Sequence, residues 1–457
     1  MLQTLINAFK VKEIRKKVGM MLLLLLIFRI GCYIPVPGLD RAVFEEMFKT
    51  GVANDYLQLM SSLTGGALAQ GTIFALGIGP YINASIIMQL LSVGIPALER
   101  LSKQGEEGRK KIAQYTRYVT ILLAIIQSIG IILTSANQQV TIDGKTTTAL
   151  AGYLPMFGGS EFLMGAFMTI VYTAGAFLVM WLGERITDYG VGNGQSMIIF
   201  VGILSTASTL LTGRMTEIFK GDLNVIWEIV AFILVSAVIF FAIVYVDLSE
   251  RKIPVQYAKQ IKGRKMYGGQ SSSIPMRISG SGVMPLIFAF SIISFPQMIN
   301  SMADPSGTGW FSRNIGPWIT ASIGNNNINT EWYHRLVYTL FLCILIFAFS
   351  FFYAQMQFNP EDVSRSIQQN GGFIHGIRPG KATEAYLKKI SNRITLFGAI
   401  YLSLVAFIPS VAFYEVSPIL LNAFSTTGIL IVVSCAMEFE KQLQAQLMMK
   451  NHKGFLK

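Results

Sequence analysis

The sequence predicts an all-α polytopic membrane protein, and three observations support this fold class. Of the 457 residues, 52% are apolar and only 14% are charged, whereas soluble domains usually carry about a quarter charged residues. Uncharged apolar stretches of about 20 residues, the length that crosses a bilayer core, recur from end to end. No polar linker divides the chain into soluble domains. The composition therefore excludes a soluble enzyme, a disordered protein and a disulfide scaffold.

Ten of these stretches are predicted to be transmembrane helices. They cover approximately residues 18–36, 72–92, 118–136, 162–182, 196–212, 225–246, 283–303, 336–356, 395–413 and 417–436. A basic segment precedes the first stretch, as in a secretory signal, but no small-residue cleavage site follows it. The first stretch is therefore predicted to remain as a membrane helix.

The positions of the basic residues predict the orientation of the helices. Most of the 37 lysines and arginines lie in the N-terminal segment, in the loops that follow even-numbered spans and in the C-terminal tail. The positive-inside rule places such segments in the cytoplasm, so both termini are predicted to be cytoplasmic. The orientation of the helices therefore explains most of the net charge of +12, without a nucleic-acid partner.

The predicted spans contain few chemically active groups. Only Arg29 and Glu228 are charged within them, whereas ion-coupled carriers usually keep ionisable groups at mid-membrane. The three histidines and three cysteines are dispersed and have no metal-ligand spacing. We therefore expect no enzymatic activity, no metal and no cofactor.

A small, uncharged segment precedes the second span. It consists of Ser61, Ser62, Leu63, Thr64, Gly65, Gly66, Ala67, Leu68, Ala69 and Gln70. Small side chains suit a short mobile segment that packs into a cavity, and an ordinary re-entrant turn is the alternative. The second span itself contains Gly77, Gly79 and Pro80, which weaken helical hydrogen bonding.

Two long loops, residues 247–282 and 359–392, carry much of the remaining positive charge. In the first loop, residues 253–258 and 273–278 are predicted to be extended. In the second loop, Arg378 precedes a proline and is flanked by glycines, which presents it to a carboxylate or an RNA phosphate. Lipid headgroup binding is the alternative for this arginine.

Two shorter connections also carry turn signals. Residues 190–194 are glycine-rich but lack the lysine and hydroxyl residue of a phosphate-binding loop, so they predict a tight turn. The Asp143-Gly144 pair predicts a hairpin within residues 140–149.

Several motifs, in their order and spacing, resemble the SecY family, whose members form the channel of the bacterial Sec protein translocase. The resemblance covers essentially the whole chain. It rests on FRIG at 28–31, IPVPG at 34–38, GGAL at 65–68, residues 74–91, QYTRY at 114–118, GNG at 192–194, YAK at 257–259 and GIRPG at 376–380.

The resemblance implies a ten-helix clamshell of two pseudo-symmetric five-helix halves, residues 1–212 and 213–457. Residues 61–70 would be the plug of an hourglass-shaped channel. A ring of mostly aliphatic side chains would form its constriction: Ile78, Ile82, Gln195, Ile199, Ile287 and Ile431. Gln195 departs from the aliphatic residue usual at its position. A dry ring of this kind resists water and ions.

The resemblance also implies a lateral gate, in which the second and seventh helices face the third and eighth. Its candidate polar residues are Ser85, Gln89 and Gln127. An apolar signal sequence would open this gate by burying itself there and in lipid.

The implied function is passage of unfolded secretory polypeptides across the bacterial cytoplasmic membrane, with sideways release of membrane segments into lipid. The implied partners are the membrane subunits SecE and SecG, the SecA motor ATPase, the ribosome, secretory precursors with their signal sequences, and membrane lipid. The residues expected to contact SecA or the ribosome are basic and lie in the two loops: Arg251, Lys252, Lys259, Arg264, Lys265, Arg378 and Lys381.

Energy would come from a partner or from the membrane potential. Two other functions remain open from the residues alone. One is a secondary carrier for a small neutral solute, and the other is a ribosome receptor without a pore.

Overall fold

The computed structural model carries the chain from residue 1 to residue 457. It describes residues 9–37, 39, 41–49, 61, 64–137, 139–142, 145–148, 160–219, 224–257, 260–262, 265–267, 271–278, 284–303, 309, 314, 318, 332–416 and 426–453.

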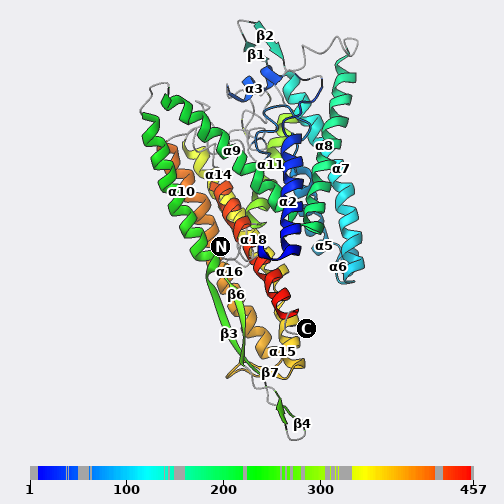
Figure 1. Ribbon diagram of the computed structural model, residues 1–457, viewed down its shortest axis with the longest axis vertical. Coiled ribbons are helices and arrows are strands. Elements are labelled where there is room, and N and C mark those ends of the chain that lie inside the picture. Colours follow the sequence, from blue (N-terminus) through cyan, green and yellow to red (C-terminus); the bar gives the residue numbers. More distant parts are fainter. Residues whose placement is uncertain are drawn as a thin grey trace. The chain divides into compact units, whose positions relative to one another are not determined.

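A helix overlaps each of the ten predicted spans (Figure 1). In chain order these helices are α2 (Lys12–Gly31), α5 (Gly79–Gly94), α7 (Glu106–Asn137), α8 (Glu161–Tyr189), α9 (Gly194–Phe219), α10 (Asn224–Leu248), α11 (Met284–Ala303), α14 (Trp332–Gln357), α16 (Lys381–Val416) and α18 (Thr426–Lys453). Three shorter helices are α3 (Arg41–Lys49), α6 (Pro96–Ser102) and α15 (Pro360–Gln369). The predicted helical architecture is therefore confirmed.

Six helices of the described part of the chain are long and apolar enough to cross a membrane. The number rises to seven if α5 and α6, which are bent by 105° at the break between them, form one span. Helices α2 and α18 overlap predicted spans but continue through charged segments.

The second predicted span begins later than expected. Residues 72–78 form turns, and α5 starts only at Gly79. Gly71 and Gly77 have φ values of 59° and 53°, a backbone region that glycine adopts without steric cost. Pro80 lies in the first turn of α5, where a missing N–H does no harm. The same residues that were expected to weaken this helix therefore determine where it begins.

The chain forms two compact units. One consists of Met1–Phe232, Ser291–Tyr338 and Phe413–Lys457, and the other of Ile233–Phe290 and Thr339–Ala412. The predicted halves, residues 1–212 and 213–457, are a different division of the chain, based on pseudo-symmetry between two sets of five helices. This pseudo-symmetry stays a prediction.

The main core of the first unit lies where α7 and α8 run side by side (Figure 1). Met168 and Tyr172 of α8 are fully buried against Ala124 and Ile131 of α7. Leu68, from the small segment that precedes α5, is buried in the same cluster. A loop residue therefore lies in the centre of the helical core.

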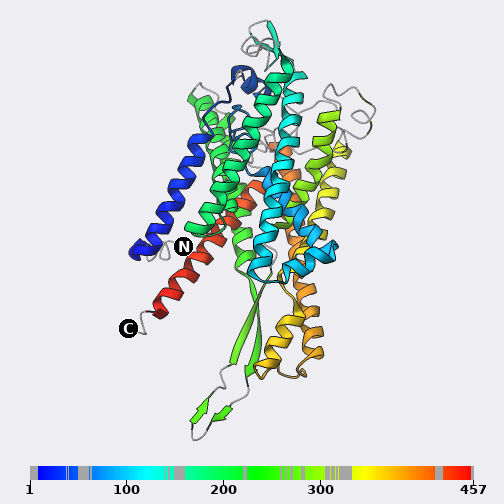
Figure 2. The same cartoon turned by 90° about the vertical axis from the view of Figure 1, so that its right-hand side faces the viewer.

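In the second unit, the two long loops join in one sheet, and Figure 2 shows its two long strands beside α15. Strands β3 (Glu250–Tyr257) and β6 (Ser271–Arg277) pair antiparallel, with Ile253 opposite Ile274. Strand β7 (Gly372–Phe373), from the other loop, pairs with β3 and gives the order β6-β3-β7. The predicted extended runs are thus confirmed, and the loops form one structure instead of two.

This sheet has its own hydrophobic core, built with α15 and the first turns of α16. Its buried members are Ile253, Val255, Met276, Ile367, Ile374, Leu387 and Ile390. We call the sheet, α15 and residues 374–394 the platform.

Two small hairpins complete the described strands. Strands β4 (Gln260–Lys262) and β5 (Lys265–Tyr267), which follow β3 and precede β6 in the sequence, pair with each other as a separate two-stranded sheet. Strands β1 (Gln139–Ile142) and β2 (Lys145–Thr148) form the predicted hairpin, whose Asp143-Gly144 tip lies outside the described residues.

Candidate functional site

The chain that contains the small segment leaves the helices after residues 34–36 and returns to them at residues 71–73, where these two stretches pair. The N–H of Val36 donates to the carbonyl of Gly71 at 2.9 Å, and the N–H of Ile73 donates to the carbonyl of Ile34 at 3.0 Å. These two hydrogen bonds form a short antiparallel ladder. We call residues 34–36 and 71–73 the base, because the chain between them begins and ends there.

The base is packed tightly against α2 and α8. The rings of Phe28 and Phe74 are stacked with their centroids 6.0 Å apart, and a β-carbon at Gly31 would lie only 2.0 Å from the Phe74 ring. A β-carbon at Gly175 of α8 would lie 1.8 Å from the Ile73 carbonyl oxygen. Glycine at both helix positions is therefore what lets the base approach so closely.

Hydroxyl side chains hold the segment in a compact turn. The Thr64 hydroxyl donates to the Ser61 carbonyl at 3.1 Å and accepts the Leu68 N–H at 3.4 Å. The Thr72 hydroxyl donates to the Ala67 carbonyl at 3.0 Å. Short side chains can satisfy nearby backbone groups in this way without helix or sheet.

The body of the segment is almost completely enclosed. Ala67 and Leu68 are 1% and 0% exposed, and the Thr64 methyl group lies over Gly77, 2.6 Å from where a β-carbon would be. Of the ten predicted plug residues, Ser62 and Leu63 lie outside the described residues. The rest are buried or half-buried, and their role as a plug stays a prediction.

Two of the predicted ring residues meet on one side of α8. Measured from the position of a β-carbon on Gly183, the Ile78 Cδ1 lies at 3.5 Å and the Gln195 Cγ at 3.2 Å. The Tyr81 hydroxyl lies within hydrogen-bonding reach of the Gln195 side chain. The amide at this unusual position therefore has a polar neighbour on α5.

For the other four predicted ring residues, the structure gives burial but no contact with one another. Ile199 of α9 and Ile431 of α18 are buried, and Ile82 is half-buried. Ile287 is half-buried in α11, within the second unit. Closure of all six into a ring stays a prediction.

A polar cluster that the sequence reasoning missed lies beside this region. The Arg117 guanidinium donates to both carboxylate oxygens of Glu184, at 2.8 and 2.9 Å. Tyr81 is close enough to interact electrostatically with both residues. Arg117 was part of a recognised motif, but no sequence signal identified Glu184 as its partner.

Among the described residues, two of the candidate gate residues contact each other, and no hydrogen bond joins them to the third. Gln89 donates from its amide nitrogen to the Ser85 hydroxyl at 3.3 Å, within α5 itself. Gln127 of α7 is 1% exposed, and neither polar atom of its amide has a hydrogen-bond partner among the described residues. A buried amide without a hydrogen-bond partner lowers the stability of the folded protein by about 1–3 kcal/mol.

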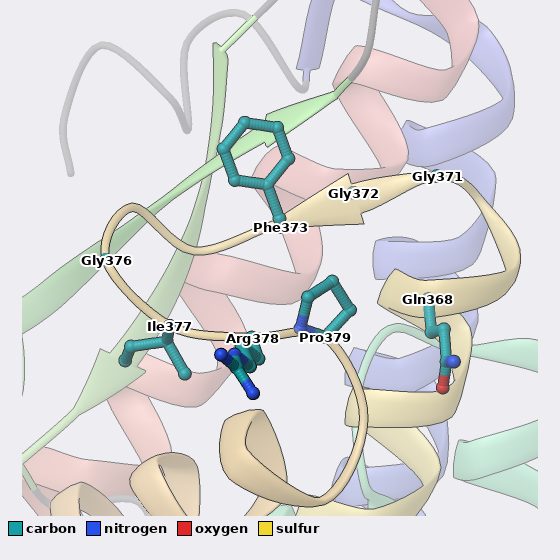
Figure 3. A pocket seen from close by; sticks show the side chains of 8 residues that line it. All are labelled: Gln368, Gly371, Gly372, Phe373, Gly376, Ile377, Arg378 and Pro379. Atoms are coloured by element: carbon teal, nitrogen blue, oxygen red, sulfur yellow. The ribbon is translucent and has the colours of Figure 1, made fainter.

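On the platform, two hydrogen bonds hold the backbone of the loop at Arg378 and just after it. The Thr383 hydroxyl donates to the Arg378 carbonyl at 2.9 Å, and the Ser364 hydroxyl donates to the Gly380 carbonyl at 2.8 Å. Gly376 and Gly380 have φ values of 80° and 96°. Figure 3 shows this loop beside Gly372 and Phe373, around a cavity of about 710 Å³.

The Arg378 side chain is exposed, and its guanidinium has no hydrogen-bond or ion-pair partner within the part of the chain that the structure describes. Among the other basic residues expected to contact partners, Arg251, Lys252 and Lys381 are exposed. Lys265 lies in β5, and Lys259 and Arg264 lie outside the described residues.

Comparisons with known proteins agree with this architecture. The SecY family model matches residues 72–440. The chain is 40% identical over 459 residues to the protein translocase subunit SecY of Streptomyces coelicolor, with 100% of each chain covered.

Two solved structures have the same fold, each at 20% identity and with 95% of this chain and 93% of the other covered. One, at a TM-score of 0.66, is a SecY protein whose plug domain stabilises the closed state of the translocation channel and maintains a membrane seal. The other, at 0.64, is Sec61 in a canine ribosome-channel complex from the endoplasmic reticulum.

Proposed function

The chain belongs to the SecY family, and on this premise we propose that it is the gated channel through which unfolded polypeptides cross a bacterial membrane. The single observation that carries the proposal is a compact, uncharged turn, residues 64–70, that is seated in the helical core and leads directly into the base at residue 71.

A fixed base allows the plug to move without disturbing the helices. The ladder between residues 34–36 and 71–73 is made of backbone hydrogen bonds, whereas the plug body is attached to its surroundings mainly by packing of small side chains. Displacing the body therefore breaks few hydrogen bonds to the helices, one of which is that from Arg29 to the Gly65 carbonyl. When the body is in place, it would close the channel to water and ions.

The predicted ring would form the second barrier. Ile78 marks the start of α5, immediately after the plug and its connecting turns. Aliphatic side chains at a narrow point exclude water and so exclude ions, yet they can separate around an extended polypeptide. Gln195 would be tolerated there because Tyr81 lies within reach of its amide.

Sideways release would use the candidate gate residues Ser85, Gln89 and Gln127. The unpartnered amide of Gln127 makes the closed arrangement less stable than an apolar residue would. A signal sequence that inserts an apolar segment between helices would therefore need to overcome only a weak contact.

The platform would receive the cytoplasmic partners, the ribosome and the SecA motor ATPase, with Arg378 as a contact for a carboxylate or phosphate. Both termini would then lie in the cytoplasm, and SecE and SecG would complete the membrane complex. The exposed guanidinium and its fixed loop support this assignment.

The experiment is a translocation assay in lipid vesicles with the complex of this chain and its membrane subunits. We expect a secretory precursor to become protected from added protease when the motor and ATP are supplied. Uptake of a small neutral solute without any precursor translocation would instead establish the carrier function and overturn this proposal.

A further inference from the structure

Arg29 is a charged residue within a predicted membrane span. It lies in the last turn of α2, where a cation interacts favourably with the helix dipole. A charge at this depth is costly unless it is paired, and it usually has a functional role. The plug channel described above assigns no role to this arginine.

Its contacts are specific. The Arg29 Nη1 donates to the carbonyl of Gly65 at 3.2 Å, and its Nη2 donates to the hydroxyl of Tyr33, also at 3.2 Å. The guanidinium carbon lies 4.9 Å from the centroid of the Tyr33 ring. Tyr33, just after the end of α2, therefore orients the guanidinium through Nη2. The other terminal nitrogen, Nη1, points to the plug.

Gly65 fits closely between Arg29 and α9. A β-carbon at Gly65 would lie 3.0 Å from the Arg29 Nη1 and 3.0 Å from the carbonyl oxygen of Gly202. The φ of Gly65 is 73°, a conformation that other residues rarely adopt. The absence of a side chain is therefore what lets the plug carbonyl reach the guanidinium.

We propose that Arg29 is a positioning residue that latches the plug in its closed place through the Gly65 carbonyl. The inference rests on the proposed channel function. A hydrogen bond from a charged donor is stronger than a neutral one, and this bond must break when the plug body leaves. Tyr33 keeps the guanidinium in position meanwhile, so that the bond re-forms when the plug returns.

The test measures the resting open probability of single channels in planar bilayers, with the complete membrane complex. Arg29→Met removes the donor and keeps much of the side-chain volume. We expect its resting open probability to rise about tenfold or more, because losing one charge-assisted hydrogen bond shifts an equilibrium by about that factor. Arg29→Lys, which keeps a charged donor, should show a smaller rise.

Arg41→Met is the matched control. Arg41 also reaches the plug, through a hydrogen bond to the Gln70 side chain, but this bond is exposed and 3.4 Å long. Its loss should leave the resting open probability unchanged.

A second variant disrupts the Arg29–Gly65 hydrogen bond by changing the plug residue. Gly65→Ala should also raise the resting open probability, and Arg29→Met should add little in that background, since the bond is already lost. If Arg29→Met adds its full effect there, the two residues act independently and the latch is wrong.

The inference and the proposed function fail in different ways. A silent Arg29→Met channel, beside a leaking channel that lacks residues 61–70, would refute the latch and leave the plugged channel intact. A silent deletion channel that also translocates no precursor would refute the channel itself.

Discussion

Arg117 of α7 and Glu184 of α8 form a two-pronged ion pair, with nitrogen-to-oxygen distances of 2.8 and 2.9 Å. The two side chains are 45% and 24% exposed, so solvent screens part of their attraction. The pair joins the two helices that enclose the plug-bearing core, beside Tyr81 of α5.

Replacing Arg117 by Met should destabilise the protein by about 1 kcal/mol, an estimate already discounted for solvent exposure. The measure is the midpoint of thermal unfolding of the purified complex. Arg117→Met in a Glu184→Gln background should cost less than it does alone, since the pair is then already broken. Arg185→Met is the matched control, because the contacts of Arg185 with Asp188, Trp181 and Tyr189 all lie within α8 and join no second helix; an equal loss there would contradict the assignment.

Gln195→Leu should lower the channel's permeability to ions. The substitution supplies the aliphatic group usual at this position and removes the amide that Tyr81 approaches. In a channel that lacks residues 61–70, we expect its single-channel conductance to fall. Tyr81→Phe removes the hydroxyl without changing the predicted ring, so an equal fall in that variant would show that the polar neighbour of Gln195, and not the ring, sets the conductance.

Gln127→Leu should stabilise the closed protein. Its buried amide has no partner among the described residues, and removing such a group recovers about 1–3 kcal/mol. We expect a higher thermal midpoint and poorer translocation of a precursor whose signal sequence has been made less apolar. An unchanged midpoint, together with normal use of the weakened signal, would show that the amide is satisfied in the membrane.

Arg378→Glu should strongly reduce motor-dependent translocation while the protein still inserts and assembles. The Arg378 loop is fixed through backbone contacts to Thr383 and Ser364, so the side chain can be reversed in charge without disturbing its support. Lys110→Glu, on the exposed surface of α7 and outside the platform, is the matched charge reversal. If both variants translocate equally well, Arg378 is not a partner contact.

The helices and hairpins were predictable from the sequence because they depend on neighbouring residues. Apolar stretches predicted a helix at each of ten places, and the Asp143-Gly144 signal predicted the hairpin of β1 and β2. The start of α5 was predicted too early, because an apolar stretch does not distinguish a buried turn at Gly71 and Gly77 from a helix.

The contacts between distant segments were not predictable from the sequence. Nothing near Phe373 indicates that it pairs with Gln256, and nothing near Glu184 indicates Arg117. Composition indicated a small segment at residues 61–70, and the resemblance implied that it is a plug, which stays a prediction; its base depends on residues 34–36 pairing with 71–73 and on Ile73 lying against Gly175 of α8. Such contacts follow from the packing of the whole unit and leave no periodic pattern.

The account's central claim is that residues 61–70 close a protein-conducting channel. Recording single channels from the complex in planar bilayers, with and without these residues, tests it most directly. We predict a silent bilayer with the intact chain at rest and a persistent ionic current when residues 61–70 are deleted. An equally silent bilayer with the deletion variant, properly inserted and assembled, would contradict the claim.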